Sequence, residues 1–397
     1  MFDFLKQPLS LKSRPTMPSF VLPGTGALLR GPGARRTRSL VGLEIEPGQL
    51  IAAQSRVNGH LVVERAAGKP IAANIVRDGE VTDVNALSEA LSELFAGSGL
   101  DRRVRIGIAN QRIVMRQIEL PPITDPKELH NAVQFQAQDE IPMPIESVVL
   151  DYHVLGVVDT DAGPKMQVLL VAARRDMVER ILLAARQAGL RPEGVDLAAF
   201  GMIRALRPLD VDADEQVLYL SIGGLTNLAI ARGATCEFTR VITTGVEHIV
   251  AEVAATAGVP LADARRLVAD VAGQDDLSTS GLPAVGGSLH GDGPADAAAE
   301  GGRVARVALA DGIRRIAAEV RNSLDFHTSS HGEGAVSHAV LTGPALDLPG
   351  FDTALGRELG LTFVRGAVDV VNEAAMGHVP MSRLAVAAGL SVQEGVQ

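Results

Sequence analysis

The chain has 397 residues, of which 46% are apolar and 21% charged, so it can bury two or more cores. A net charge of −10, two tyrosines and no tryptophan argue against a protein that stacks on nucleic-acid bases. The single cysteine, Cys236, excludes an internal disulfide and suits a reducing cytoplasm. There is no uncharged apolar run of 18 residues and no secretory signal pattern, so we expect no transmembrane helix.

Residues 1–38 carry seven basic residues against one acid, Asp3. Their Pro, Gly and Ser content predicts a largely disordered tail. Two interpretations stay open for Met1–Lys6: a short interfacial segment that touches anionic lipid, or part of a solvated basic tail.

The first ordered stretch, 39–53, predicts two strands joined by a tight turn at Glu46-Pro47-Gly48. The following elements are expected to be strands at 60–66 and 71–77, a helix at 85–97, and a strand pair at 103–109 and 113–120. This pattern predicts a hairpin sheet with covering helices.

Residues 119–156 combine a helix, a proline break and a strand. Asp125 is a natural N-cap, and Pro126 suits the first helical position. The prolines of Ile141–Pro144 end the helix, because proline lacks the backbone donor. A strand over 147–155 follows.

The second half of the chain opens like the first, with three expected strands after an acidic linker at 210–215. The elements leading to the linker are a strand at 166–172, a helix at 177–188 ended by Gly189, a strand at 193–197 and a helix at 198–207. Those after it are strands at 216–222, 226–232 and 235–242, helices at 247–257 and 260–271, a mobile loop at 272–302, a helix at 304–327, a strand at 335–341, a helix at 350–358, a strand at 361–364 and a helix at 381–390. We therefore expect two similar α/β lobes.

The helix, proline break and strand of 119–156 resemble the inserted small domain of the PilM family, cytoplasmic actin-like proteins of type IV pilus assembly. The segments Val171–Arg175, Gly189–Pro192 and Ala387–Leu390 add to the resemblance, which covers about residues 40–390. It implies an α/β, actin-like (ribonuclease H-like) two-lobed fold with a small inserted α/β subdomain, of the SHS2 type, in the first lobe.

The resemblance also implies domain boundaries after the basic tail. They are a first lobe at 39–118, joined again by 197–210 and 380–397, an insert at 119–196, a second-lobe core at 211–250 and 335–379, and an outer subdomain at 251–334.

In this superfamily a glycine hairpin in each lobe holds phosphate, because glycine lets several backbone N–H groups converge on one anion. The first hairpin, Val41–Ile51, is similar to V-G-I-D-I-G-S-S-S-V-K, with Glu44 at the usual Asp. Glu46 replaces a glycine and Pro47 removes a donor. A carboxylate about 4 Å from a phosphate oxygen repels it by roughly 1 kcal/mol in water and about 4 kcal/mol at an effective dielectric of 20.

The other nucleotide elements also depart from the family pattern. Ser221 stands at the usual metal-holding Asp, Pro344 at a glycine, and Asn322 at an arginine. The implied, degenerate ATP cleft comprises Glu44, Gly48, Ser221, Gly223, Gly224, Thr226, Glu319, Ser323, Gly343 and Pro344. We expect ATP and magnesium to bind weakly or not at all, and the chain not to be an enzyme.

The remaining residues suggest no other chemistry. The histidines lack metal-ligand spacing, and no nucleophile elbow, zinc-protease or Walker motif occurs. We therefore expect no metal site and no catalytic residues.

The resemblance implies a scaffold that binds the cytoplasmic tail of a PilN-like inner-membrane protein in a groove between insert and first lobe. The groove needs a sheet edge, for which 113–120, 147–155 and 166–172 are candidates. The expected partner-binding residues are Ile113, Met115, Ile118, Val149, Tyr152 and Val154. The chain would then be cytoplasmic, peripheral at the inner face of the cell membrane, and a further partner is the cytoplasmic assembly ATPase.

Two alternatives remain. One is an active actin-like ATPase or filament former similar to FtsA, but FtsA-like proteins end in an amphipathic membrane helix, whereas this chain ends in Ser391–Gln397. The other is a cytoplasmic secretion-system homologue, which normally continues into a transmembrane helix.

Overall fold

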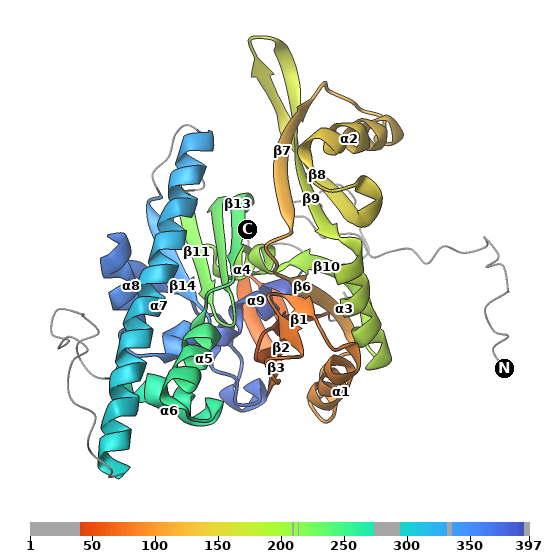
Figure 1. Ribbon diagram of the computed structural model, residues 1–397. Coiled ribbons are helices and arrows are strands. Elements are labelled where there is room, and N and C mark those ends of the chain that lie inside the picture. Colours follow the sequence, from red (N-terminus) through yellow and green to blue (C-terminus); the bar gives the residue numbers. More distant parts are fainter. Residues whose placement is uncertain (1–39, 209, 213, 274–293, 332–335, 393–397) are drawn as a thin grey trace, which may run out of the picture.

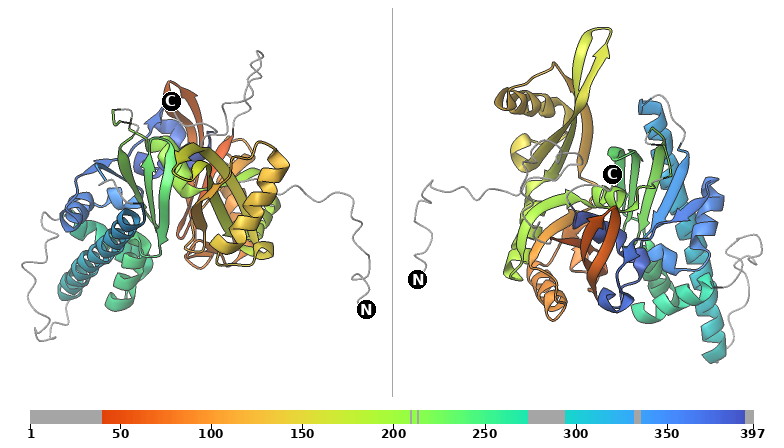
Figure 2. Two further views of the ribbon diagram at one scale, coloured as in Figure 1. Left: turned by 90° about the horizontal axis from the view of Figure 1, so that it is seen from above. Right: turned by 180° about the vertical axis from the view of Figure 1, so that it is seen from behind.

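The computed structural model describes residues 40–392 except 209, 213, 274–293 and 332–335 (Figure 1). The predictions for the basic tail, and for most of the loop at 272–302, lie outside these residues. Two α/β lobes stand side by side, and a smaller subdomain projects from one of them (Figure 2).

The first lobe is built on a six-stranded sheet with the order β10-β6-β1-β2-β3-β16. Its strands are β1 (Val41–Glu46), β2 (Gln49–Asn58), β3 (His60–Pro70), β6 (Arg103–Ile108), β10 (Arg191–Leu197) and β16 (Asp369–Val370). The first three are antiparallel neighbours, and β6 and β10 add in parallel. A two-residue turn at Pro47 and Gly48 joins β1 to β2 as predicted, with φ +89° at Gly48.

The second lobe repeats this topology in the order β13-β12-β11-β14-β15. Its strands are β11 (Gln216–Ile222), β12 (Thr226–Arg232), β13 (Thr235–Ile242), β14 (His338–Thr342) and β15 (Phe363–Arg365). Again three consecutive antiparallel strands are followed by two parallel ones. The predicted duplication of lobes is therefore confirmed strand by strand.

Helices cover both sheets, and the second-lobe sheet lies between the two main cores. The first-lobe core contains α1 (Val84–Phe95), α3 (Arg175–Gln187), α4 (Ala198–Leu206) and α9 (Ala385–Leu390). The second-lobe core contains α5 (Val246–Ala257), α6 (Leu261–Ala272), α7 (Pro294–His331) and α8 (Phe351–Leu359). Tyr219 and Ala229 of the second sheet join the first-lobe core, so α4 packs between the lobes.

The insert has a core of its own, between one helix and a three-stranded sheet with the order β7-β9-β8. Its elements are β7 (Val114–Leu120), α2 (Pro126–Glu140), β8 (Val148–Thr160) and β9 (Gly163–Arg174). The Asp125 side chain accepts hydrogen bonds from the backbone N–H groups of Lys127 (2.8 Å) and Glu128 (3.0 Å), which confirms the predicted N-cap.

Several predicted boundaries need correction. The insert is predicted over 119–196, whereas its sheet spans 114–174. α3 packs on α1, and β10 pairs with β6 of the first-lobe sheet. β6 and β7 are not a strand pair, because β6 pairs with β1 and β10 while β7 pairs with β9. The segment 71–77 is largely not a strand: β3 extends to Pro70, and only Val76–Arg77 (β4) pairs, with Glu80–Val81 (β5).

Near the C-terminus three further differences appear. The helix expected at 304–327 begins at Pro294, so part of the expected loop is helical. The helix expected at 381–390 is a short 3-10 turn, Met381–Arg383, followed by α9. β16 pairs with β3, so 369–370 belongs to the first lobe and not to the second.

Close backbone contacts and a buried ionic cluster hold α9 in place. A Cβ on Gly389 would lie 1.8 Å from the Gly201 carbonyl oxygen, so only glycine allows α4 and α9 to approach so closely. Arg204 forms a buried ion pair with Asp196 and donates from Nε to the Gly389 carbonyl (2.9 Å). Arg105 donates to the carbonyls of Leu390 and Val392, at 3.1 and 2.7 Å. In the part of the chain that the structure describes, no helix is long and apolar enough to cross a membrane.

Candidate functional site: a closed cleft and an open pocket

The two hairpin turns of the expected, degenerate ATP cleft meet between the lobes. Between them lies a cavity of only about 10 Å³, lined by Glu44, Glu46, Gln49, Ser221, Thr342, Gly343, Pro344, Ser382, Arg383 and Val386. The space holds about one water molecule. The structure thus brings together Glu44, Ser221, Gly343 and Pro344 of the predicted cleft.

The Glu46 side chain of the first hairpin contacts the second hairpin. Its Oε2 accepts a hydrogen bond from the Gly224 N–H at 3.3 Å, so a carboxylate occupies a donor that a phosphate would need. A Cβ on Gly224 would lie 2.3 Å from the Pro47 carbonyl oxygen, so glycine here serves close packing of the two turns.

Arg383 bridges the same space from the segment before α9. Its guanidinium forms an ion pair with Asp347 at 2.6 Å and donates to the Gln49 side chain at 3.0 Å. Ser382 adds a bond to Asp347 at 2.7 Å, and its carbonyl accepts from the Gly343 N–H at 2.8 Å. Sequence reasoning missed Arg383, since no motif surrounds it.

Burial changes the protonation of both carboxyl groups on β1. Burial raises the pKa of Glu44 well above its usual range, and the neighbouring Glu46 adds to the shift. Burial raises the pKa of Glu46 to about 7, although its hydrogen bond from Gly224 partly offsets the shift. Glu46 is therefore partly protonated near neutral pH.

The remaining predicted cleft residues lie outside this cavity. Gly48 faces Glu247, and the Thr226 hydroxyl donates to the Thr244 carbonyl at 2.7 Å. Glu319 and Ser323 lie on α7, where both bond Arg240 of β13, at 2.9 and 3.2 Å. These residues therefore contact other parts of the protein and do not line the cavity between the hairpins.

The residues present do not fit a magnesium triphosphate in this conformation. The cavity is too small for a triphosphate. Glu46 accepts from the Gly224 N–H and would repel a phosphate, and Pro47 has no backbone N–H to donate. Ser221 supplies no carboxylate for a magnesium ion. Among the described residues, no group of three His, Cys, Asp or Glu side chains could hold a metal ion.

The predicted partner-binding residues separate into two sets on opposite faces of the insert sheet. Ile118, Tyr152 and Val154 pack with α2, and Ile118 is only 4% exposed. Ile113, Met115 and Val149 pack against the first lobe. The two sets therefore face different cores, because neighbouring residues of a strand point to opposite faces.

The sheet topology decides which candidate edge is available. β9 is the central strand, so 166–172 cannot receive a peptide, whereas β7 and β8 are edges.

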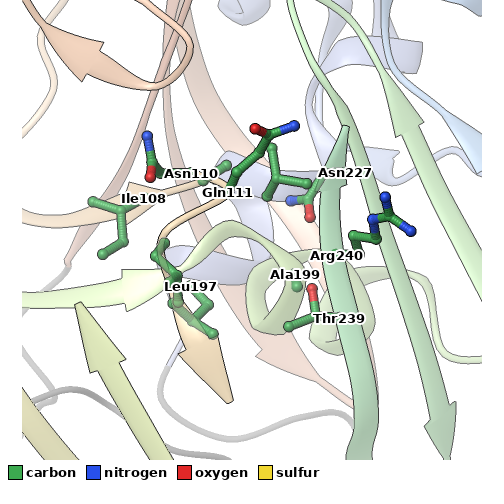
Figure 3. Close-up of a pocket in the computed structure, with 11 residues that line it drawn as sticks. Ile108, Asn110, Gln111, Leu197, Ala199, Asn227, Thr239 and Arg240 are labelled. Carbon is green, nitrogen blue, oxygen red and sulfur yellow. The ribbon is translucent and has the colours of Figure 1, made fainter. Parts of the chain in front are cut away.

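Just before the start of β7 lies a pocket of about 280 Å³ between the two lobes (Figure 3). It is lined by Ile108, Ala109, Asn110, Gln111, Ile113, Leu197, Ala199, Asn227, Thr239, Arg240 and Val241. Two hydrogen bonds of Asn110 hold the loop from β6 to β7: its side chain donates to the Asp78 carbonyl and accepts from the Arg112 N–H, each at 2.7 Å. Of the predicted residues only Ile113 lines it, and no sequence pattern indicated the rest.

Two lobes of the same topology, closed on each other by their hairpin turns, define the actin-like ATPase fold. A family model described as "Type IV pilus assembly protein PilM" matches residues 46–268, more than half of the chain. The chain belongs to this family.

One solved structure supports the fold, and two more distant similarities are given beside it. The chain resembles one from a "PilM-PilN type IV pilus biogenesis complex", with 24% identity, a TM-score of 0.71, and 91% of this chain and 99% of that chain covered. The ethanolamine utilization protein EutJ of Carboxydothermus hydrogenoformans gives 16% identity, a TM-score of 0.48 and coverages of 88% and 88%. MreB5 of Spiroplasma citri gives 12% identity and a TM-score of 0.46, with 89% of this chain and 95% of that chain covered. Only the first similarity is strong enough to support the fold.

Proposed function

We propose that this chain is a scaffold of type IV pilus assembly that binds the cytoplasmic tail of a PilN-like inner-membrane protein. The tail lies as an extended segment along β7 and places an apolar side chain in the pocket at its start. The observation that carries the proposal is this pairing of an edge strand with an open pocket. The similarity to a chain solved within a PilM–PilN complex supports it.

Several consequences belong to the same proposal. A bound tail holds the chain at the inner face of the membrane. The chain then links the membrane complex to the cytoplasmic assembly ATPase.

The first prediction tests tail binding by calorimetry with a synthetic peptide of the PilN-like tail from the same organism. Ile113→Asp should weaken binding by about tenfold or more, because it places a charge in the apolar part of the pocket. Gln111→Trp, at an exposed position of the pocket rim, should block the same site without disturbing a core.

Val364→Asp is the matched control. Val364 is 59% exposed on β15, the edge strand of the second lobe opposite to β13, so the affinity of this variant should equal that of the wild type. No heat from the wild-type protein, or equal binding by Gln111→Trp, would count against the proposal.

We further propose that nucleotide binding is weak or lost and that the chain is a non-catalytic member of its fold class. The support is the small cavity, the Glu46 contact to Gly224 and the Arg383 bridge. These contacts fill the space between the hairpins with the protein's own side chains. The same observations disfavour an active actin-like ATPase.

The second prediction concerns Mg-ATP. A ligand at 100 times its Kd stabilises a protein by about 2.7 kcal/mol, which a melting curve detects readily. We expect millimolar Mg-ATP to leave the melting temperature within error of the value in Mg²⁺ alone. A saturable rise with ATP concentration would show that the cleft opens and binds nucleotide.

A further inference from the structure

The pocket beside β7 contains a buried polar atom whose role the proposed function does not explain. Asn227, on β12 of the second lobe, is only 3% exposed, and its Oδ1 has no hydrogen-bond partner among the described residues. A buried acceptor without a donor costs roughly 1–3 kcal/mol, so such an atom calls for an explanation. Figure 3 places the Asn227 amide on the pocket side of its strand, facing the segment that carries Gln111.

Other polar side chains of the pocket are already engaged. The Thr239 hydroxyl donates to the Leu228 carbonyl at 2.8 Å, and Arg240 pairs with Glu319 at 2.9 Å. Asn110 uses its amide to fix the loop between β6 and β7. Gln111 is exposed at the rim of the pocket, so Asn227 Oδ1 is the buried acceptor that remains for an incoming N–H group.

Two sheet edges border this pocket from opposite sides. β7 is an edge of the insert sheet, and β13 is an edge of the second-lobe sheet. Ile113 just before β7 and Thr239–Val241 of β13 line the same pocket. Figures 1 and 2 show the two strands facing each other. An extended backbone has the N–H and C=O groups that such edges can bind.

We infer that the second lobe takes part in peptide recognition: an extended segment lies between β7 and β13, and one of its backbone N–H groups donates to Asn227 Oδ1. This inference rests on the proposed function and adds a second wall to the groove. The bound peptide then touches both lobes, so its binding holds them in one relative position. A 280 Å³ pocket matches one apolar side chain with its backbone amide better than a cofactor.

The test uses the full chain and the synthetic tail peptide. Asn227→Leu keeps the side-chain size and removes the acceptor, and it should raise the Kd about 5- to 20-fold. Asn131→Leu, at an exposed asparagine on α2, is the matched control and should leave the Kd unchanged. Melting curves show whether either variant is folded.

Hydrogen–deuterium exchange on the wild-type protein provides a measurement without substitution. Peptide binding should slow amide exchange in 235–242 of β13 as well as in 114–120 of β7. The inference requires both the higher Kd of Asn227→Leu and the slower exchange in β13. Unchanged affinity of a folded Asn227→Leu means that water satisfies Oδ1, and unchanged exchange in β13 means that the second lobe is not touched. Either overturns the inference but leaves the proposed function standing, whereas a wild-type protein that does not bind overturns both.

Discussion

Arg204→Met should lower the free energy of unfolding by about 3–5 kcal/mol, because it leaves Asp196 charged and buried without its partner. Both side chains are almost fully buried, at 3% and 0% exposure. The substitution also removes the donor to the Gly389 carbonyl, so α9 loses a contact that fixes it against α4. Urea unfolding of the two proteins measures the difference.

Two further variants give this prediction its controls. Asp196→Asn in the Arg204→Met protein removes the unpaired charge and should recover a substantial part of the loss. Arg266→Met breaks an exposed ion pair with Asp263, 3.1 Å long, and should cost at most about 0.5 kcal/mol. A loss below about 1 kcal/mol for Arg204→Met would mean that the cluster is solvated and contributes little.

Glu46→Gln should stabilise the protein at alkaline pH by up to about 3 kcal/mol, because it removes the need to ionise a buried carboxyl group. The amide oxygen of the introduced glutamine can still accept from the Gly224 N–H. The folded-state pKa of Glu46 is raised from 4.5 to about 7, so the folded protein binds this proton more tightly than the unfolded chain. Its contribution to stability is complete below pH 4.5 and is lost as the pH rises through about 7.

The measurement is urea unfolding at about pH 5 and about pH 8 for the wild type and Glu46→Gln, on either side of the raised pKa. The two proteins should be similar at the acidic pH, and the variant should be the more stable one at the alkaline pH. Glu179→Gln, at an exposed position on α3, is the control and should follow the wild type at both pH values. Parallel pH curves for Glu46→Gln and the wild type would refute a buried, protonated Glu46.

Local chemistry is predicted correctly wherever a few neighbouring residues fix the backbone. Pro47-Gly48 makes the first turn, and Asp125 caps α2. Gly189, at φ +74°, follows the end of α3 as predicted. These features need no distant partner, so their residues predict them directly.

Errors arise where a strand's sheet depends on distant residues. β6 and β7 are close in the sequence, yet β6 pairs with β1 and β10 while β7 pairs with β9. The alternation of side chains indicates a strand but does not name its neighbour. In the same way β10 pairs with β6 in the first-lobe sheet, although its residues lie within the predicted insert.

The residues of this chain alone predict two similar α/β lobes. The resemblance to the PilM family adds the insert and the departures from a phosphate-binding hairpin. The tertiary structure shows which distant residues the departing side chains contact. Arg383 meets Gln49 across 334 positions of the chain, and Asn227 meets the loop before β7 in one pocket. Cleft closure and pocket shape arise from packing between distant segments, which no local pattern encodes.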